Sequence, residues 1–387
     1  MARRLGAGSP ADAVARGLDG LWLSAGLGLA VAVLLNRYAA PLAAAFGPTD
    51  AAHAQAVTYL KVAAFGLPAM LAVLAATGTL RGLLDTRTPL LAAVSGFTGN
   101  IGLNLFFVHG LHWGIAGSAW GTVLAQNAMG AGLVAVVVRR ARRLGVVVRP
   151  RPAAVLGAAR GGLPLLVRTV ALRTVLLVAV WAAAQLGDVP LAAHQIVATV
   201  WSVLAFTVDA LAIAAQAIVG RELGAGRVAA ARAATATMLR WGVGSGVLLG
   251  VLVVVIRGPL SALFTPDPAV QRYAAAALVV VGAGQLVSGY VFVADGVLMG
   301  AGDFGYLAWA MLGVLAAYLP AVVVARALLG PPDPTAGAAL AGTAPPVERP
   351  GDLVVLWIAF LVMMLARAIT LGARLRSGRW AVSGATR

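Results

Sequence analysis

This chain of 387 residues contains no cysteine, and charged residues make up only 11% of it. Without cysteine there is no disulfide framework, no thiolate metal site and no cysteine nucleophile. The four histidines, at positions 53, 109, 112 and 194, are too scattered to form a metal-binding motif. A soluble globular protein carries about 25% charged residues. The low charge and the 61% of hydrophobic residues therefore predict an integral membrane protein.

Long apolar runs recur along the whole chain. A membrane-spanning helix needs about 20 predominantly apolar residues. This criterion predicts ten spans, near residues 20–35, 57–80, 89–108, 113–138, 161–185, 190–220, 236–256, 272–299, 304–329 and 352–373. An even number of spans places both termini on the same side of the membrane.

The basic residues divide unevenly between the two sets of connecting loops. One set, which includes both termini, holds 20 of the 29 Lys and Arg residues, the other holds 6, and the last three lie in or beside spans. The positive-inside rule places the first set, and both termini, in the cytoplasm. The basic run 139–151 (RRARRLGVVVRPR) could by itself bind nucleic acid or anionic lipid, but we interpret it as a loop that sets topology, with no nucleic-acid partner.

The chain resembles itself at an offset of 218 residues. Residues 3–8 (RRLGAG) recur at 221–226 as RELGAG, and the same offset aligns Phe46 with Phe264, Leu80 with Leu298, Gly82 with Gly300 and Asp85 with Asp303. A parallel repeat in an apolar chain is a common plan of secondary transporters. Two spans, 161–185 and 190–220, precede the second copy and have no counterpart before the first.

The repeated segments also carry a family resemblance. Residues 80–89 (LRGLLDTRTP) resemble the inner-loop signature of the MATE (multidrug and toxic compound extrusion) family. Residues 193–196 (AHQI) and the run from Asp209 to Gly226 look like its second half, and 295–303 (DGVLMGAGD) are similar to the DinF-like branch (DNA-damage-inducible protein F). The resemblance implies twelve helices in two lobes that export organic cations and other amphiphiles against a proton or sodium gradient.

Ten spans are two fewer than the resemblance implies, so we expect the first two helices of the fold to be absent from the sequence given. The fold class is then an all-α integral membrane protein with about ten helices of a twelve-helix, two-lobe fold. We expect an incomplete N-terminal lobe of four helices at 1–138, a basic cytoplasmic linker at 139–160 and a six-helix C-terminal lobe at 161–387. A start codon assigned too late, or a truncated gene, is the simplest explanation, and a genuine ten-helix protein is the alternative. An in-frame upstream sequence encoding two more spans would support a late start codon.

Two carboxylates, Asp209 and Asp295, lie inside predicted spans, where a charge costs about 2.5–3.5 kcal/mol. Asp209 lies about 16 Å from the inner end of its helix, at 1.5 Å per residue. Arg173 lies at a similar depth on the preceding helix, so the two could form an ion pair. Asp295 is closer to its helix end and could reach the interface, as could Arg168. Either these residues couple ion movement to transport, or they only join helices.

Further polar residues within the spans are candidates for a substrate cavity: Asn100, Asn104, His194, Gln195 and Gln216. For each of them an interhelical or interfacial structural role is the alternative. The repeated cytoplasmic turns are candidates for an inner gate: Gly82, Asp85, Gly224, Gly226, Gly300 and Asp303. Glycine permits tight turns there, and neither stretch matches a phosphate-binding pattern.

The function predicted is multidrug or organic-cation efflux by a monomeric antiporter of the bacterial cytoplasmic membrane. It needs no cofactor beyond the transported H⁺ or Na⁺, and its partners are amphiphilic or cationic small molecules and the bilayer. A lipid-linked precursor flippase should line its cavity with several cations, and only Arg168 and Arg173 qualify. An intramembrane enzyme needs clustered acids or a His–acid pair, which the sequence lacks, so we do not expect an enzyme. A non-transporting remnant is the third alternative.

Overall fold

The computed structural model describes residues 2–44, 50–329 and 349–384, which form α-helices and one π-helical segment and contain no strand. Phe46, one anchor of the repeat, lies outside the described residues. Among the helices described, nine are long and apolar enough to span a membrane, and a bent pair adds a tenth. The all-α membrane fold predicted from the composition is therefore confirmed.

The chain divides into two compact units, residues 1–162 and 163–387. The boundary falls inside the long helix α8 (Pro152–Ala184). Much of the basic linker predicted at 139–160 is helical, because α7 (Gly114–Arg143) continues to its fourth basic residue and α8 begins at Pro152.

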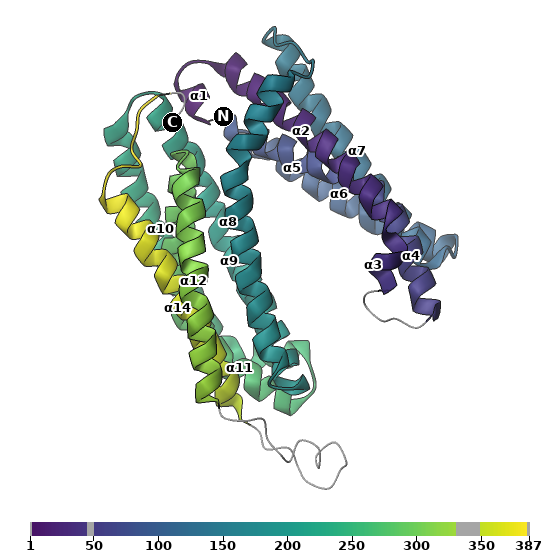
Figure 1. Ribbon diagram of the computed structural model, residues 1–387, viewed down its shortest axis with the longest axis vertical. Coiled ribbons are helices and arrows are strands. Elements are labelled where there is room, and N and C mark those ends of the chain that lie inside the picture. The colour runs from purple at the N-terminus through teal and green to yellow at the C-terminus, as the bar shows by residue number, and fades with distance from the viewer. Residues whose placement is uncertain (1, 45–49, 330–348, 385–387) are drawn as a thin grey trace. The chain divides into compact units, whose positions relative to one another are not determined.

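Unit 1 is a helical bundle (Figure 1). Its core is small and aliphatic. Helix α2 packs on α5, α6 on α7, and α5 on α7. Val14, Leu18, Leu80, Leu133 and Val137 fill the space between α2, α5 and α7. Besides α7, the elements are α1 (Ala2–Gly6), α2 (Pro10–Arg37), α3 (Ala39–Ala44), α4 (Asp50–Ala64), α5 (Leu67–Gly82), α6 (Arg87–Leu105) and the π-helix η1 (Phe106–Gly110).

Two predicted spans of unit 1 differ from the structure. The first, expected at 20–35, extends over the whole of α2, because the alanine- and glycine-rich sequence before residue 20 also forms a buried helical face. The second, expected to be continuous over 57–80, consists of α4 and α5, which are bent by 46° where they meet. Pro68 opens α5 and lacks the N–H that a continuous helix would need there.

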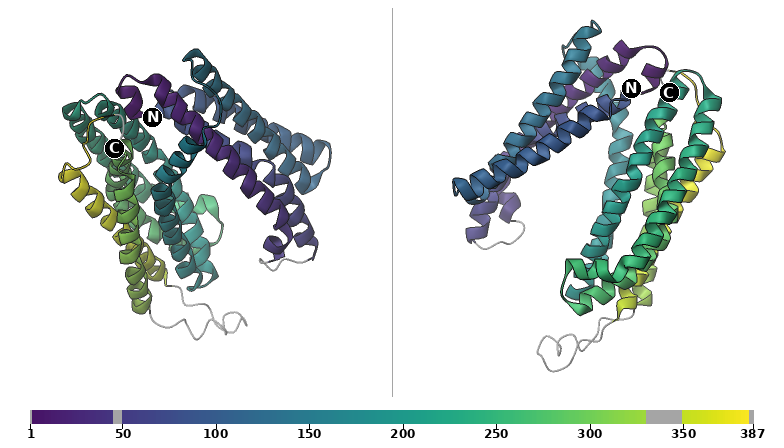
Figure 2. Two further views of the ribbon diagram at one scale, coloured as in Figure 1. Left: turned by 45° about the horizontal axis from the view of Figure 1, so that its top comes forward. Right: turned by 180° about the vertical axis from the view of Figure 1, so that it is seen from behind.

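Unit 2 is built around α11 (Pro268–Gly300), the most extensively buried helix of the described chain. It packs against α9 (Asp188–Gly224), α10 (Val228–Phe264) and α14 (Pro350–Arg376), and α12 (Phe304–Leu328) packs on α14. These helices run side by side along the unit in all the ribbon views (Figures 1 and 2).

Glycines let α10 and α11 approach each other closely. A Cβ on Gly242 would lie 2.6 Å from the carbonyl oxygen of Gly289, and Gly246 and Gly250 face the backbone of Gln285 and Gly282 in the same way. Helices in membranes associate through such small-residue faces because no hydrophobic driving force joins them in lipid. The four-residue spacing of the α10 glycines therefore sets the position of the central helix.

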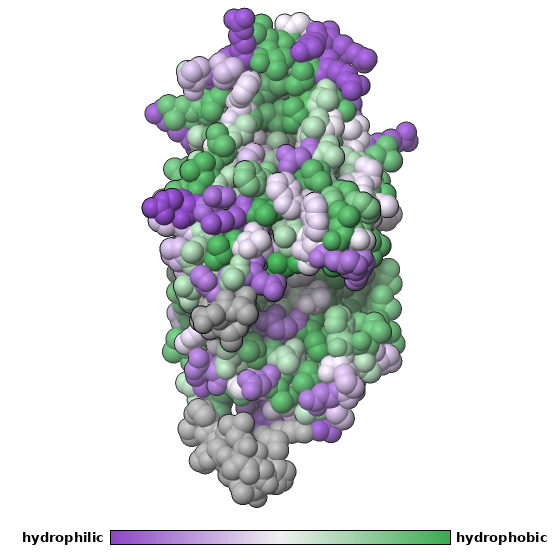
Figure 3. All heavy atoms as spheres, turned by 90° about the vertical axis from the view of Figure 1, so that its right-hand side faces the viewer, coloured by the Kyte–Doolittle hydropathy of each residue, from purple (hydrophilic) through white to green (hydrophobic). Residues whose placement is uncertain are grey.

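Large apolar side chains cover much of the outer surface of the helices. Leu90, Leu91, Val94 and Phe97 on α6 are all more than half exposed. On the face shown in Figure 3, hydrophobic residues occupy broad areas between patches of hydrophilic ones. An exposed apolar surface of this extent is expected where helices contact hydrocarbon.

The sequence repeat is also a repeat of backbone structure. Gly8 and Gly226 both adopt a positive φ, +78° and +77°, and in both copies the same hydrogen bonds close the end of the helix. Leu84 (φ +63°) occupies the position of Gly302 (φ +72°), and the amides of Asp85 and Asp303 both donate to the leucine carbonyl five residues earlier. The offset of 218 residues thus aligns equivalent helix ends.

Candidate substrate cavity and buried ion cluster

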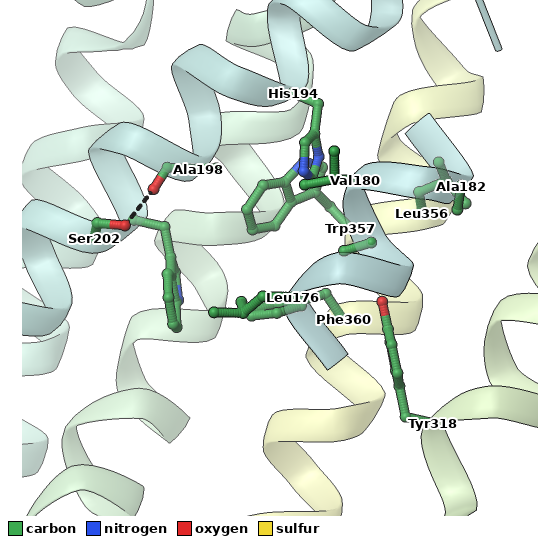
Figure 4. A pocket seen from close by; sticks show the side chains of 12 residues that line it. Leu176, Val180, Ala182, His194, Ala198, Ser202, Tyr318, Leu356, Trp357 and Phe360 are labelled. Carbon is green, nitrogen blue, oxygen red and sulfur yellow. Dashed lines mark hydrogen bonds between the residues drawn. The ribbon is translucent and has the colours of Figure 1, made fainter. Parts of the chain in front are cut away.

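Unit 2 contains a cavity of about 130 Å³ between α8, α9, α12 and α14 (Figure 4). Aromatic rings form much of its wall: Trp357 lies 5.2 Å from Phe360 and 5.4 Å from His194, and Trp201 meets Phe360 edge-on at 5.1 Å, centroid to centroid. Aliphatic side chains and Ser202 complete the lining, and no carboxylate is among the described residues that line it. Planar apolar molecules and organic cations both bind to such rings.

Two polar atoms of the cavity residues lack a hydrogen-bond partner among the described residues, Nδ1 of His194 and Nε1 of Trp357. Both side chains are at least nine-tenths buried. A buried polar atom without a partner costs free energy, which a ligand with a matching group would recover. Of the predicted cavity residues, His194 therefore lies in this wall, whereas its neighbour Gln195 is exposed.

A buried ion cluster lies between α8, α11 and α14. Arg168 on α8 donates a hydrogen bond to Oδ2 of Asp295 on α11, and Nη2 of Arg367 on α14 lies 3.8 Å from the same oxygen. Asp295 is 8% exposed and Arg367 only 5%. The sequence left open whether Asp295 and Arg168 reach the membrane interface; in the structure the two side chains pair with each other within unit 2.

The cluster holds two guanidinium groups and one carboxylate, a net charge of +1. Arg367 donates one hydrogen bond among the described residues, from Nη1 to the sulfur of Met364 at 4.0 Å, and its Cζ lies 5.8 Å from the centre of the Phe292 ring. These are weak partners for a group with five N–H donors. Sequence reasoning noted Arg367 only as a residue in or beside a span; the rarity of arginine in spans was the signal that could have singled it out.

The aromatic cavity and the ion cluster are borne by the same helices. Phe360 of the cavity precedes Arg367 of the cluster by seven residues on α14, or about 10 Å along the helix axis. On α12, Tyr318 lines the cavity and Val314, one turn earlier, lines the space beside the cluster. Movement of α12 or α14 would therefore act on both sites.

The predicted ion pair between Arg173 and Asp209 is not among the ion pairs of the described residues. Arg173 is exposed on α8, one and a half turns from Arg168, and Asp209 is half-buried on α9. The matching helical depths were a necessary condition for pairing, but they did not fix the rotation of each helix. Gln216, two turns beyond Asp209, is half-buried, and its backbone packs against Gly300.

In unit 1, the candidate cavity residues Asn100 and Asn104 belong to one hydrogen-bond network. Asn100 on α6 donates to the hydroxyl of Thr122 on α7 at 3.2 Å, and Asn104 donates to the carbonyl of Asn100 at 2.9 Å. Both are half-buried. The Asn100 bond is the interhelical hydrogen bond that was the alternative to substrate contact, whereas the Asn104 bond lies within α6.

Each of the two repeated turns is tied to the last helix of its own unit. Asp85 accepts hydrogen bonds from Thr88 and pairs with Arg140 on α7, and Asp303 pairs with Arg374 on α14 at 2.7 Å. Burial raises the pKa of Asp85, but the Thr88 hydrogen bonds and the Arg140 guanidinium outweigh it and hold the pKa below its usual range.

The glycines of these turns have different roles. Gly226 and Gly302 take the left-handed backbone conformation, whereas Gly300 is helical and lies so close to the Gln216 backbone that no Cβ would fit. Gly82 ends α5 and Gly224 ends α9. The expectation of turn freedom is thus wrong for Gly300, whose small size serves helix packing.

One buried acid was missed by sequence reasoning. Asp19 on α2 is 1% exposed and accepts hydrogen bonds from Arg151 at 2.8 and 2.9 Å. Arg151 belongs to the basic run, so this end of the run is bound to the helical bundle of unit 1. The predicted first span began one residue too late to include Asp19.

The fold and these sites define a class of protein: a multi-spanning helical membrane protein built from a repeat, with a small aromatic cavity and buried charges. The MatE family model matches residues 1–106 and 164–324. The chain therefore belongs to the MATE family of multidrug and toxin efflux transporters.

Curated relatives and solved structures agree with this assignment. The chain is 34% identical to Protein DETOXIFICATION 44, chloroplastic, of Arabidopsis thaliana, over 76% of this chain and 56% of the relative. It is 32% identical to Protein DETOXIFICATION 43 of the same plant, over 91% and 63%. A crystal structure of a MATE protein in complex with MaD5 superposes with a TM-score of 0.82 at 18% identity, over 98% of this chain and 82% of that one.

The chain thus spans 56% to 63% of the lengths of these two plant proteins. Because the curated relatives are plant DETOXIFICATION proteins and a NorM multidrug resistance protein of Pseudomonas aeruginosa, the DinF-like branch is not confirmed.

Proposed function

We propose that this protein exports small amphiphilic or cationic organic molecules in exchange for H⁺ or Na⁺, by alternating access between two lobes. The observation that carries this proposal is the aromatic cavity within unit 2 of a chain that belongs to the MATE family. The cavity wall is aromatic and uncharged, so it accepts flat ligands of varied structure. A cation is held there by ring faces at about 0.5–2 kcal/mol per contact.

The finer parts of the proposal come from the sequence. From the loop charge we propose that both termini lie in the cytoplasm. From the sequence resemblance we propose a monomer of the DinF-like branch in the bacterial cytoplasmic membrane. The coupling role falls to Asp209, because two guanidinium groups hold Asp295 and releasing it would break both ion pairs. Ion and substrate need only prefer different states for exchange to occur.

The test of the cavity is Trp357→Ala, with Trp309→Ala as its control. Trp357 is 4% exposed in the cavity wall and Trp309 on α12 is 76% exposed. In proteoliposomes loaded with ethidium, we expect Trp357→Ala to reduce transport at least tenfold and Trp309→Ala to leave it unchanged. Equal activity of the two variants would contradict a role for this cavity.

The test of coupling is Asp209→Asn. We expect this variant to lose accumulation driven by a pH or sodium gradient while it still exchanges labelled for unlabelled ethidium at equal concentrations. Asp295→Asn serves as the comparison, since it removes the other intramembrane carboxylate. Gradient-driven accumulation by Asp209→Asn would exclude Asp209 as the coupling group.

A further inference from the structure

We infer that the Arg168–Asp295–Arg367 cluster of unit 2 is a binding site for a small anion, either a free halide or the carboxylate end of a larger molecule. This site is separate from the aromatic cavity, and the inference goes beyond the proposed export function without depending on it. Four observations support it: the net charge of the cluster, the unsatisfied donors of Arg367, the size of the cavity beside them and the aliphatic wall of that cavity.

The charge count leaves one cation without a counter-ion. Asp295 neutralises one guanidinium, and both arginines approach the same carboxylate oxygen, Oδ2. No other carboxylate lines the space beside the cluster among the described residues. A charge held away from water without a partner is costly, so buried charges in proteins are paired or bind ions.

The hydrogen bonds identify Arg367 as the group that lacks a partner. Its guanidinium is buried, and its contacts are the 3.8 Å approach to Asp295, the sulfur of Met364 and the Phe292 ring. A guanidinium offers five N–H donors in a planar fork that matches an anion. An anion beside Arg367 would satisfy donors that no described residue satisfies.

The space beside these groups is the right size for a small occupant. A cavity of about 10 Å³ is lined by Arg168, Asp295 and Arg367, together with Thr370 and aliphatic side chains of α12. That volume is close to what one water-sized atom requires. One oxygen of a carboxylate fits this space as it stands, and a halide fits when the aliphatic side chains of the wall move slightly outward. The aliphatic α12 wall lowers the local dielectric and so strengthens the attraction.

The first experiment measures anion-dependent stabilisation of the purified full chain in detergent. The midpoint of thermal unfolding is followed while sodium isethionate, a sulfonate salt without a carboxylate, is replaced by sodium chloride or sodium formate at constant ionic strength. We expect a saturable rise of several degrees with at least one of them. Chloride alone would identify a free halide as the ligand, and formate alone or both would identify a carboxylate-compatible site.

Arg367→Gln should weaken the apparent affinity at least tenfold, whereas Arg374→Gln should leave it unchanged. Arg374 is the matched control because it lies two turns further along α14 and has its own partner, Asp303, at 2.7 Å. The absence of a rise in the wild-type protein, or an equal rise in Arg367→Gln, would overturn the inference.

A second measurement does not depend on whether a variant folds. Wild-type crystals grown in sodium bromide should show an anomalous peak within hydrogen-bonding distance of the Arg168 and Arg367 guanidinium groups. Ordered bromide elsewhere, with no peak at this cluster, would refute a halide site and leave the formate response as the deciding result. Failure of ethidium export would not affect either measurement, so the two proposals stand or fall separately.

Discussion

Two substitutions in the ion cluster should differ in their effect on stability, because only one of them leaves buried guanidinium groups without a carboxylate. Asp295→Asn leaves two buried guanidinium groups, with side chains 16% and 6% exposed, and removes their carboxylate. Breaking a buried pair in this way costs about 3–5 kcal/mol. Arg367→Met removes the excess charge instead and leaves the one-to-one pair of Arg168 and Asp295.

For Arg367→Met we therefore expect no loss of stability in a buffer that lacks small anions. The variant forfeits the contact with the Phe292 ring, worth about 0.5–2 kcal/mol, but it no longer buries an unneutralised guanidinium. Methionine is flexible enough to fill the space beside Met364. The double variant, which combines Asp295→Asn with Arg367→Met, should be more stable than Asp295→Asn alone, because its cluster keeps one guanidinium instead of two.

The assay is SDS titration and thermal unfolding of the four proteins in detergent and sodium isethionate, arranged as a double-mutant cycle. The expected order of stability is Arg367→Met equal to or above wild type, then the double variant, then Asp295→Asn. The reasoning is refuted if Arg367→Met is the least stable protein and Asp295→Asn is as stable as wild type. The net charge of the cluster would then not determine its contribution to stability.

Three further outcomes follow from the helix ends and helix packing. Leu84→Gly should stabilise unit 1 by up to about 1 kcal/mol in thermal unfolding, because a left-handed residue with a side chain costs roughly 1–2 kcal/mol; a loss would show that the Leu84 side chain packs favourably. Gly242→Ala should destabilise by about 1–3 kcal/mol through overpacking, whereas Gly244→Ala, which has open space around its Cβ, should not. Stability from Asp85 is fully present above its ordinary pKa of 3.8 and is lost as the pH falls through the lower folded value; Asp85→Asn should abolish that part of the acid sensitivity, and an unchanged acid profile would contradict the assignment.

Apolar length and the repeat were enough to predict the all-α membrane fold. The offset that aligns Asp85 with Asp303 also aligned the turns around them. Helix ends commonly require a left-handed residue and a fixed set of backbone hydrogen bonds, and the local sequence encodes both. The bend between α4 and α5 was not predicted, since Pro68 lies within a run that is apolar throughout and hydropathy alone does not register a kink.

The candidate site was predicted less completely. His194 and Asp295 were singled out as candidates, but the sequence did not predict that both are buried. Their neighbours Trp357, Phe360 and Arg367 come from a helix more than 60 residues away in sequence. Helical depth can be counted from a sequence, whereas rotation about the axis depends on packing. That is why Arg168, and not Arg173, meets a carboxylate on the facing helix.

The proposed function requires that this chain move organic molecules across a membrane against their gradient. The most direct measurement is uptake of ethidium by inside-out proteoliposomes containing the chain as given, with an imposed pH gradient, an imposed sodium gradient, or neither. We expect ethidium to accumulate above its equilibrium level with one of the two gradients. The accumulation should collapse when an ionophore dissipates that gradient. Ethidium levels that equal those of protein-free liposomes under every gradient, with correctly folded protein present, would contradict it.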